Sequence, residues 1–591
     1  MIRIFGHLTK RQWEQVVLAI ALIVVQVWLD LSLPDYMANI TKLAETPGST
    51  MAEILEQGGS MMLCALGSMV ATAMVTYLAA KVASGLGRTL RSKVFDHTLE
   101  LSKGETERFG AASLVNRCTN DITQIQMLVS MGLNAIVKAP VMAVWAVAKI
   151  VGYGWQWSLA TGVSAALVAG MLGLTIVFSV PRFARVQGLN DVINRLVREH
   201  LQGIRPVHAY NAERYEQERF NLANDEITDN NLVAYRVMAI MSPGMTFVTS
   251  TLTLVVYWIG AHLVEASGMV DKLTVYSQMV VFSNYAMQVI MAFILLTMIF
   301  ILLPRAQVSA RRVLEVIDTT NDVVSGGGAE IADRDKGTVE FQDVSFSYPD
   351  DGVRALSHIS FKAARGETVA FIGATGSGKT ALVQLVDRLY DASDGRALVD
   401  GVDVRDFDLD DLRNRIGYVP QTATLFKGTV TSNLSYGDCG HEVSDADVRK
   451  AISIAQSTDF VEAMPKGYDA TIEQGGRNVS GGQRQRLAIG RAIARHPEIL
   501  VFDDSFSALD FTTDRMLRHA LDRECAGTTR LVVAQRVSTI RHADQIVVLD
   551  HGRVAGLGTH EQLMGSCPTY QEIVSSQLSA KEMSHAYPHK P

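Results

Sequence analysis

The sequence is poor in charged residues and in cysteine, and it has no excess of basic residues. Charged residues make up 19% of the chain and hydrophobic residues 48%, a balance too apolar for an ordinary soluble enzyme. The formal net charge of −7 provides no basic face, so we expect no nucleic-acid partner. The five cysteines are far apart and form no C-x-x-C pair, and we expect them to be reduced.

Long apolar runs lie only in the first half of the chain, and the second half has the composition of an ordinary α/β protein. Because 591 residues are too many for one hydrophobic core, we expect two or more domains. Each run is long enough to cross a hydrocarbon core of about 30 Å as a helix. Buried helices of a large soluble core are an alternative that six such runs argue against. The runs are Val16–Leu33, Met61–Ala83, Ala135–Val151, Leu159–Val180, Met245–Val264 and Tyr276–Leu303.

Lysine and arginine are concentrated in two of the connections between these runs. Segments 84–130 and 182–237 are rich in both residues. Segments 35–57 and 265–274 contain one lysine each. Because positively charged connections stay on the cytoplasmic side, we expect a multi-pass protein of the plasma (inner) membrane with both termini in the cytoplasm. The two basic connections are polar and helically periodic, which predicts helices that continue beyond the membrane.

The second half of the chain contains a phosphate-binding sequence. Val369–Gly373 is a short apolar run that leads into the pattern G-x-x-x-x-G-K-T and then into helical periodicity. Glycines in such a loop let backbone N–H groups wrap a phosphate chain, and the following helix adds its positive N-terminus. We therefore predict that this P-loop binds ATP, with Lys379 on the β- and γ-phosphates and the Thr380 hydroxyl on Mg²⁺. The predicted ligands are Gly373, Thr375, Gly376, Ser377, Gly378, Lys379 and Thr380.

Further motifs follow the P-loop. Val479-Ser480-Gly481-Gly482-Gln483 precedes a helical pattern, so a hydroxyl, backbone N–H groups and a helix N-terminus can converge on a phosphate. Ile499–Asp503 is an apolar run that ends on a carboxylate. With Tyr348, Gln421 and Asp510, these motifs resemble those of the ABC transporter ATPase family, and the resemblance covers essentially the whole chain.

The resemblance implies a role for each matching residue. Tyr348 matches the aromatic residue that stacks on adenine, and Gln421 matches the glutamine that touches Mg²⁺ and relays to the membrane half. Asp503 matches the Walker B carboxylate on Mg²⁺, and Asp510 lies in the D-loop. In this family the signature residues bind ATP held by the P-loop of the other subunit, which implies two composite sites per pair. The signature residues are Ser480, Gly481, Gly482 and Gln483.

The chain departs from the family pattern at two positions of its own ATP site. Asp504 stands where the family usually has the glutamate that orients the attacking water, and Gln535 replaces the switch histidine. Aspartate is one methylene shorter, and a misplacement of about 1 Å can cost ~100-fold in rate. A glutamine carries neither a proton nor a positive charge. We expect this site to hydrolyse ATP poorly, and harmless drift within an active site is the alternative.

The pattern resembles one subunit of the heterodimeric bacterial multidrug ABC exporters, in which one composite site is degenerate. This resemblance implies a membrane all-α six-helix transmembrane domain of the exporter-type (type IV) fold over residues 1–317. A linker over 318–337, an α/β P-loop ABC ATP-binding domain over 338–578 and a flexible tail over 579–591 are expected to follow. The implied partner is a second ABC half-transporter that supplies the normal glutamate and histidine.

The expected function is ATP-driven export of drug-like, lipid-like or other amphipathic compounds. Because nothing in the sequence gives the direction of transport, a siderophore or metabolite importer on the same fold is an open alternative. An ATP-gated channel or regulatory protein, in which the weak site holds a state instead of driving a pump, is another.

The resemblance also implies short helices that dock the membrane half on the ATPase domains, for which the candidates are 109–116 and a helix within Glu199–Glu213. Amide side chains are costly toward lipid, so those within the spans should face inward and line a substrate path. Hydrogen bonding to a neighbouring helix is the alternative for them. The substrate-path candidates are Asn284, Gln288 and Met291 on the sixth span, with Thr246 and Ser250 on the fifth.

The predicted orientation places segments 35–57 and 265–274 outside the cell. Cysteines introduced singly at Ser49 and Ser267 should therefore react with a membrane-impermeant maleimide on intact cells, because the reagent reaches only the outer surface. The unsubstituted chain, with its own cysteines, is the control for background labelling. Labelling that requires cell lysis would overturn the orientation.

Overall fold

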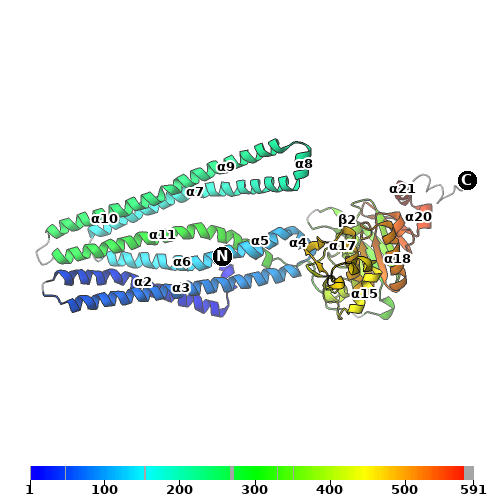
Figure 1. The fold of residues 1–591 in the computed structure, drawn as a ribbon, viewed down its shortest axis with the longest axis horizontal. Coiled ribbons are helices and arrows are strands. Elements are labelled where there is room, and N and C mark those ends of the chain that lie inside the picture. Colours follow the sequence, from blue (N-terminus) through cyan, green and yellow to red (C-terminus); the bar gives the residue numbers. More distant parts are fainter. Residues whose placement is uncertain are drawn as a thin grey trace. The chain divides into compact units, whose positions relative to one another are not determined.

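The computed structural model describes residues 2–46, 48–151, 155–266, 272–328, 331–349 and 352–577 (Figure 1). Ser267 and the expected tail over 579–591 lie outside these residues. The chain divides into two compact units, and each is described by itself. The first unit comprises Met1–His97 and Ala112–Asp318, and the second comprises Thr98–Ala111 and Thr319–Pro591.

The first unit is helical, and the described part of the chain contains six helices long and apolar enough to cross a membrane. Each of the six predicted runs lies within one of these helices, which confirms the all-α transmembrane fold. The helices are α2 (Lys10–Glu45), α3 (Met51–Glu100), α6 (Ile122–Val151), α7 (Trp155–Gln202), α10 (Met241–Ala266) and α11 (Lys272–Ile317), with the short α1 (Ile2–Phe5) before them.

Several of these helices are longer than a membrane is thick. The helices α3 and α7 contain 50 and 48 residues, whereas about 20 suffice to cross the hydrocarbon core. Figure 1 shows α7 running beside α9 (Glu213–Ala239) and α10, and α6 beside α11. Small residues on α6 and α11, among them Ala139, Ala146 and Ala286, are buried in the core of the unit and let the helices approach closely.

The two expected docking helices have different outcomes. The predicted helix at 109–116 is not continuous, because Gly110 adopts a positive φ of 73° and separates α4 (Lys103–Phe109) from α5 (Ala111–Asn116). A π-helical turn, Arg117–Asp121, then leads into α6. The second expected helix is present as α8 (Ile204–Ala209), and none of its residues is buried within this chain.

The second unit is an α/β domain built on two sheets. The larger has the order β12-β11-β3-β10-β9-β6, in which only β12 runs antiparallel to its neighbour. Its strands are β3 (Thr368–Gly373), β6 (Ile416–Val419), β9 (Ile499–Asp503), β10 (Thr529–Val533), β11 (Gln545–Asp550) and β12 (Arg553–Gly558). Every residue of β9 is buried, as expected for a central parallel strand covered on both faces.

The smaller sheet is antiparallel, with the order β2-β1-β4-β5. Its strands are β1 (Val339–Ser347), β2 (Arg354–Ala363), β4 (Asp394–Val399) and β5 (Val402–Asp403), and β7 (Gly428–Thr429) pairs separately with β8 (Thr471–Ile472). The helices are α12 (Lys379–Val386), α13 (Leu409–Arg415), α14 (Val430–Leu434), α15 (Asp445–Ile454), α16 (Thr458–Glu462), α17 (Gly481–Ala494), α18 (Phe511–Glu524), α19 (Val537–Ile540), α20 (His560–Ser566) and α21 (Pro568–Gln577). The α/β P-loop fold expected for this half is confirmed.

Candidate ATP-binding site

The larger sheet collects the predicted nucleotide residues at one edge. The strands β3, β10, β9 and β6 are parallel neighbours, so their carboxyl ends meet. The P-loop follows β3, Gln535 follows β10, Asp503 ends β9, and Gln421 follows β6. In parallel α/β sheets this edge is where ligands bind.

The P-loop is closed around the ammonium group of Lys379. Lys379 Nζ donates hydrogen bonds to the carbonyl oxygens of Gly373 at 2.9 Å and Ala374 at 2.8 Å. Gly378 has a φ of 96°, and a Cβ there would lie 2.6 Å from the Ala355 carbonyl oxygen, so only glycine fits. Burial lowers the pKa of Lys379 from its usual value, against the opposing effect of nearby carboxylates. The loop thus holds a cation among backbone groups that can wrap a phosphate chain.

A hydroxyl and a carboxylate suited to a metal lie beside the P-loop. Thr380 Oγ1 donates to Asp503 Oδ1 at 2.9 Å, and the hydroxyl of Tyr418 donates to Asp503 Oδ2 at 3.3 Å. Asp503 is 1% exposed, and burial raises the pKa of its carboxyl group. A hydroxyl and a carboxylate at this spacing are the oxygen donors that Mg²⁺ uses alongside nucleotide phosphates, so the residues fit the predicted metal.

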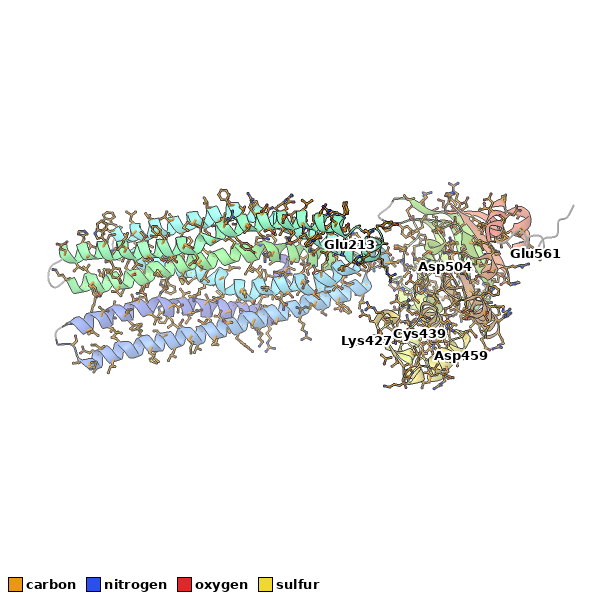
Figure 2. All side chains as sticks on the ribbon, turned by 45° about the horizontal axis from the view of Figure 1, so that its top comes forward. Glu213, Lys427, Cys439, Asp459, Asp504 and Glu561 are labelled. Carbon is orange, nitrogen blue, oxygen red and sulfur yellow. The ribbon has the colours of Figure 1, made fainter. Side chains whose placement is uncertain are left out.

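Asp504 is held by the side chains of the two predicted glutamines. Gln535 Nε2 donates to Asp504 Oδ2 at 2.6 Å, and Gln421 Nε2 donates to the same oxygen at 3.4 Å. Figure 2 shows Asp504 among the side chains of the second unit. Burial raises the pKa of Asp504, while the two amide hydrogen bonds act in the opposite direction. The two departures from the family pattern, Asp504 and Gln535, therefore meet Gln421 in one contact, in which both amides donate to Asp504 Oδ2.

The signature residues form the N-terminus of α17. The side chain of Ser480 accepts a hydrogen bond from the Gln483 backbone N–H at 3.2 Å, and Gln483 Oε1 accepts from the Ser480 N–H at 2.8 Å. Ser480 and Gly481 are exposed, whereas Gly482 lies close to the Ala508 carbonyl of the D-loop segment. Among the residues described, no hydrogen bond joins Ser480 or Gly481 to this chain's own P-loop.

Asp510 and Tyr348 occupy other parts of the second unit. Asp510 caps α18 by accepting from the Thr513 backbone N–H at 2.9 Å. Tyr348 follows β1 in the smaller sheet, and its ring meets that of Tyr390 edge-on at 5.5 Å between centroids. Neither residue shares a hydrogen bond with Asp504 or Gln535 among the described residues, and Tyr390 was not identified from the sequence.

Tyr390 links the adenine-stacking candidate to the segment Thr98–Ala111. The hydroxyl of Tyr390 donates to Glu107 Oε2 at 2.9 Å, and Lys103 Nζ lies 5.6 Å from the centroid of the same ring. Tyr390 is 5% exposed, so its ring is fixed between Tyr348 and α4. An aromatic residue after the P-loop helix carries no sequence signal for this contact, because Glu107 lies far away along the chain.

Four of the five substrate-path candidates have exposed side chains, and the fifth, Gln288, is hydrogen-bonded to another helix. Asn284 and Met291 are exposed on α11, and Asn284 Nδ2 donates to the Val280 carbonyl of its own helix at 3.0 Å. Gln288 is half-buried, and its Nε2 donates to the Asp30 carbonyl of α2 at 3.4 Å. Thr246 and Ser250 are exposed on α10.

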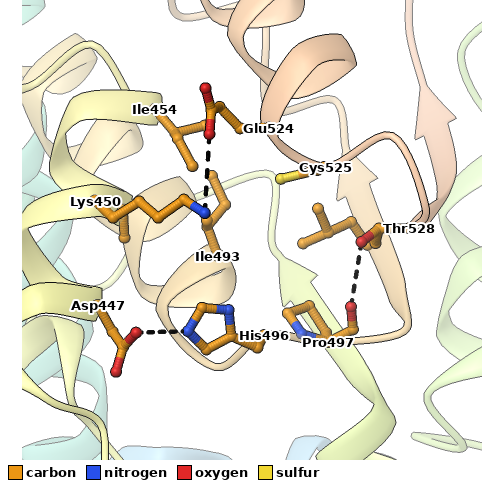
Figure 3. Close-up of a pocket in the computed structure, with 11 residues that line it drawn as sticks. Asp447, Lys450, Ile454, Ile493, His496, Pro497, Glu524, Cys525 and Thr528 are labelled. Carbon is orange, nitrogen blue, oxygen red and sulfur yellow. Dashed lines mark hydrogen bonds and ion pairs between the residues drawn. The ribbon is translucent and has the colours of Figure 1, made fainter.

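A separate pocket of about 120 Å³ lies toward the amino end of β9, opposite the nucleotide edge (Figure 3). Two of its polar pairs are His496 Nε2 with Asp447 Oδ1 at 2.8 Å and Lys450 Nζ with Glu524 Oε2 at 3.8 Å. Burial raises the pKa of the Cys525 thiol, which disfavours the reactive thiolate. These groups are paired with one another, and they form a structural cluster.

We expect Tyr390→Ala to weaken ATP binding by about 2- to 10-fold, because edge-to-face ring contacts contribute roughly 0.5–1.5 kcal/mol. Tyr390→Phe is the matched control, since it keeps the ring beside Tyr348 and removes only the hydroxyl that binds Glu107. Titration of the purified protein with a fluorescent ATP analogue measures both variants. Equal affinity of the alanine variant and the wild type would show that Tyr390 does not position Tyr348.

Two family models match the chain. The model for the ABC transporter transmembrane region matches residues 16–301, and the model for the ABC transporter matches residues 356–507. An uncharacterized ABC transporter ATP-binding protein of Mycobacterium tuberculosis is 38% identical over 561 residues, which cover 93% of this chain and 94% of that protein.

More distant relatives extend the similarity along the same length. An ATP-dependent lipid A-core flippase of Vibrio vulnificus is 30% identical over 95% of this chain and 96% of its own sequence. A solved structure of a bacterial Atm1-family ABC exporter with ATP bound superposes with a TM-score of 0.78 at 25% identity, covering 96% of this chain and 99% of that one. The chain therefore belongs to the ABC transporter family and is a multi-pass membrane protein whose ATPase domain drives transport.

Proposed function

We propose that this chain is one subunit of a heterodimeric exporter of amphipathic compounds in the plasma membrane, and that its own ATP site hydrolyses slowly. The similarity to a lipid A-core flippase and to an Atm1-family exporter supports the export of amphipathic molecules. The hydrogen bond of 2.6 Å from Gln535 to Asp504 is the observation that carries the proposal for the slow site.

Two features of this contact would slow hydrolysis: the hydrogen bonds that Asp504 already accepts, and the replacement of a histidine by an amide. A carboxylate that orients the attacking water must accept a hydrogen bond from that water. Asp504 Oδ2 already accepts from the Gln535 and Gln421 amides. An amide can neither supply a positive charge to the γ-phosphate nor exchange a proton with it. ATP would therefore bind and remain at this site.

Because the signature of this chain is intact, we assign faster hydrolysis to the ATP that is bound by the partner's P-loop. Ser480 and Gly481 are exposed at the N-terminus of α17, where a hydroxyl, backbone N–H groups and the helix dipole can receive the γ-phosphate of ATP on a second chain. The partner half-transporter would supply a P-loop, a glutamate and a histidine opposite this signature. Turnover would then pass mainly through the composite site that contains Ser480.

Mg²⁺ would be held at this chain's own site by Thr380, Asp503 and Gln421. When bound, the ion neutralises charge on the nucleotide phosphates. Lys379 would leave the carbonyl oxygens of Gly373 and Ala374 to bind the phosphates, because a phosphate offers its ammonium a charge-assisted partner. ATP on both sites would hold the two ATPase domains together and so change the conformation of the membrane half.

In the membrane half, we place both termini in the cytoplasm and the substrate path along α10 and α11. Asn284, Met291, Thr246 and Ser250 are exposed within this chain, and they would face a cavity shared with the partner. Gln288 would border the same cavity while it is bonded to α2.

The proposal predicts unequal effects of three substitutions on ATP hydrolysis by the complex. Ser480→Arg should nearly abolish steady-state turnover, because a bulky cation enters the faster site. Asp504→Ala should leave most of the turnover, since little of it passes through the slow site. Lys379→Ala should have an intermediate effect, because it weakens ATP occupancy without removing the faster site. The measurement is phosphate release by the complex purified through a tag on this chain.

The same chain purified alone provides the control. A homodimer would depend on Asp504 at both sites, so Asp504→Ala would stop hydrolysis as completely as Ser480→Arg. Strong turnover by the chain alone, removed by Asp504→Ala, would contradict the heterodimer proposal.

A further inference from the structure

Two ion pairs join α2 and α6. Asp30 and both lysines lie within the predicted membrane runs, and Asp35 follows the first run by two residues. Lys138 Nζ lies 3.2 Å from Asp30 Oδ2, and Lys149 Nζ lies 2.8 Å from Asp35 Oδ2. The helix α2 continues to Glu45, so the two aspartates lie within a helix and do not mark its end. Ionisable groups within spans are costly and indicate function, provided that their partners are identified.

The pair formed by Asp30 and Lys138 has the more developed polar surroundings. Ser68 Oγ of α3 donates to Asp30 Oδ1, and Gln288 Nε2 of α11 donates to the Asp30 carbonyl oxygen at 3.4 Å. The side chains of Asp30 and Lys138 are 25% and 19% exposed, so both are largely enclosed but neither is sealed. Four helices therefore supply groups to one polar site.

Three buried side-chain oxygens on the helices of this site have no hydrogen-bond partner among the described residues. They belong to Gln26, Asn134 and Gln288. Gln26, which is 3% exposed, precedes Asp30 by one helical turn on α2, and Asn134 precedes Lys138 by one turn on α6. A buried polar atom without a partner costs roughly 1–3 kcal/mol, so a ligand with N–H donors would relieve this cost.

The balance of charge argues against a ligand that carries a net charge. Asp30 and Lys138 together are neutral. A purely cationic or purely anionic ligand would leave one uncompensated charge in a medium of low dielectric constant. A zwitterion adds no net charge: its ammonium group can replace Lys138 beside Asp30, and its anionic group can take the freed lysine.

We propose that Asp30 and Lys138, with Gln26, Asn134 and Gln288, form a headgroup site for a zwitterionic amphiphile. The ammonium group lies at Asp30, where the Gln26 and Gln288 oxygens accept its remaining N–H groups. The anionic group lies at Lys138. This site rests on the proposed function, since it identifies the substrate class of the same exporter. Asp35 and Lys149 form a neighbouring pair whose carboxylate is bound by the Tyr285 hydroxyl at 2.7 Å.

The test uses three single-chain probes that differ only in their headgroup. Dodecylphosphoethanolamine is zwitterionic, dodecylamine is cationic and dodecyl phosphate is anionic. Each is titrated against ATP hydrolysis by the purified complex in a non-ionic detergent, and the half-maximal concentration for stimulation is measured. The wild type should respond to the zwitterion at the lowest concentration.

A substitution that removes one charge of the pair should shift the headgroup preference toward the probe that neutralises the remaining charge. Asp30→Asn should shift the preference toward dodecyl phosphate, and Lys138→Gln should shift it toward dodecylamine. Each should weaken the response to the zwitterion by about tenfold or more, as expected for the loss of a charge-assisted hydrogen bond. Lys149→Gln is the matched control: it breaks an ion pair in the same helices and should keep the wild-type preference.

If either single variant fails to fold, Asp30→Lys with Lys138→Asp keeps an ion pair between α2 and α6. The exchange puts the positive charge on the helix of Gln26 and the negative charge on the helix of Asn134. The response to the zwitterion should therefore again weaken by about tenfold. An unchanged preference in the single variants or in this exchanged variant would overturn the headgroup site. No response of an ATP-hydrolysing wild type to any probe would instead contradict amphiphile export itself.

Discussion

The hydrogen bond from Gln535 to Asp504 is the contact on which the proposed division of labour depends. It forms because β10 and β9 are parallel neighbours, so the residues after both strands meet at one edge of the sheet. The same edge carries the P-loop and Gln421, so a change at any of these positions acts on one site. In the proposed slow site, a short carboxylate held by an amide would allow ATP to bind and would act as a poor general base. In the proposed heterodimer, the exposed signature on α17 would bind the partner's nucleotide and would be unaffected by that contact.

The membrane half is governed by a different constraint, the cost of polar groups in a medium without water. There Asp30 and Asp35 are paired with Lys138 and Lys149, and the Tyr285 hydroxyl binds both Asp35 and the Leu31 carbonyl. Such contacts hold α2, α6 and α11 together. Buried side-chain oxygens of Gln26, Asn134 and Gln288 have no hydrogen-bond partner among the residues described, and for this reason we regard the Asp30–Lys138 pair as a site as well as an interhelical contact.

Local patterns in the sequence predicted the parts of the molecule that depend on neighbouring residues. Apolar runs indicated the six membrane helices, and the spacing of Gly373, Lys379 and Thr380 indicated the loop between β3 and α12. Contacts between distant segments carried no such signal. Neither the Tyr390–Glu107 hydrogen bond nor the Asp30–Lys138 ion pair follows from periodicity, because each joins helices or loops far apart in the chain. The helix expected at 109–116 begins two residues late, at Ala111, for a local reason, since the positive φ of Gly110 separates it from α4.

The most direct test of the central claim is the fate of bound nucleotide in a single turnover. The complex is loaded with radiolabelled ATP and Mg²⁺, separated from free nucleotide, and its retained ATP and ADP are measured over time. The account predicts that one nucleotide per complex is converted to ADP and released while the other remains as ATP. Photo-crosslinking of an azido-ATP analogue should then place the retained nucleotide on this chain. Conversion of both nucleotides at the same rate would contradict the account.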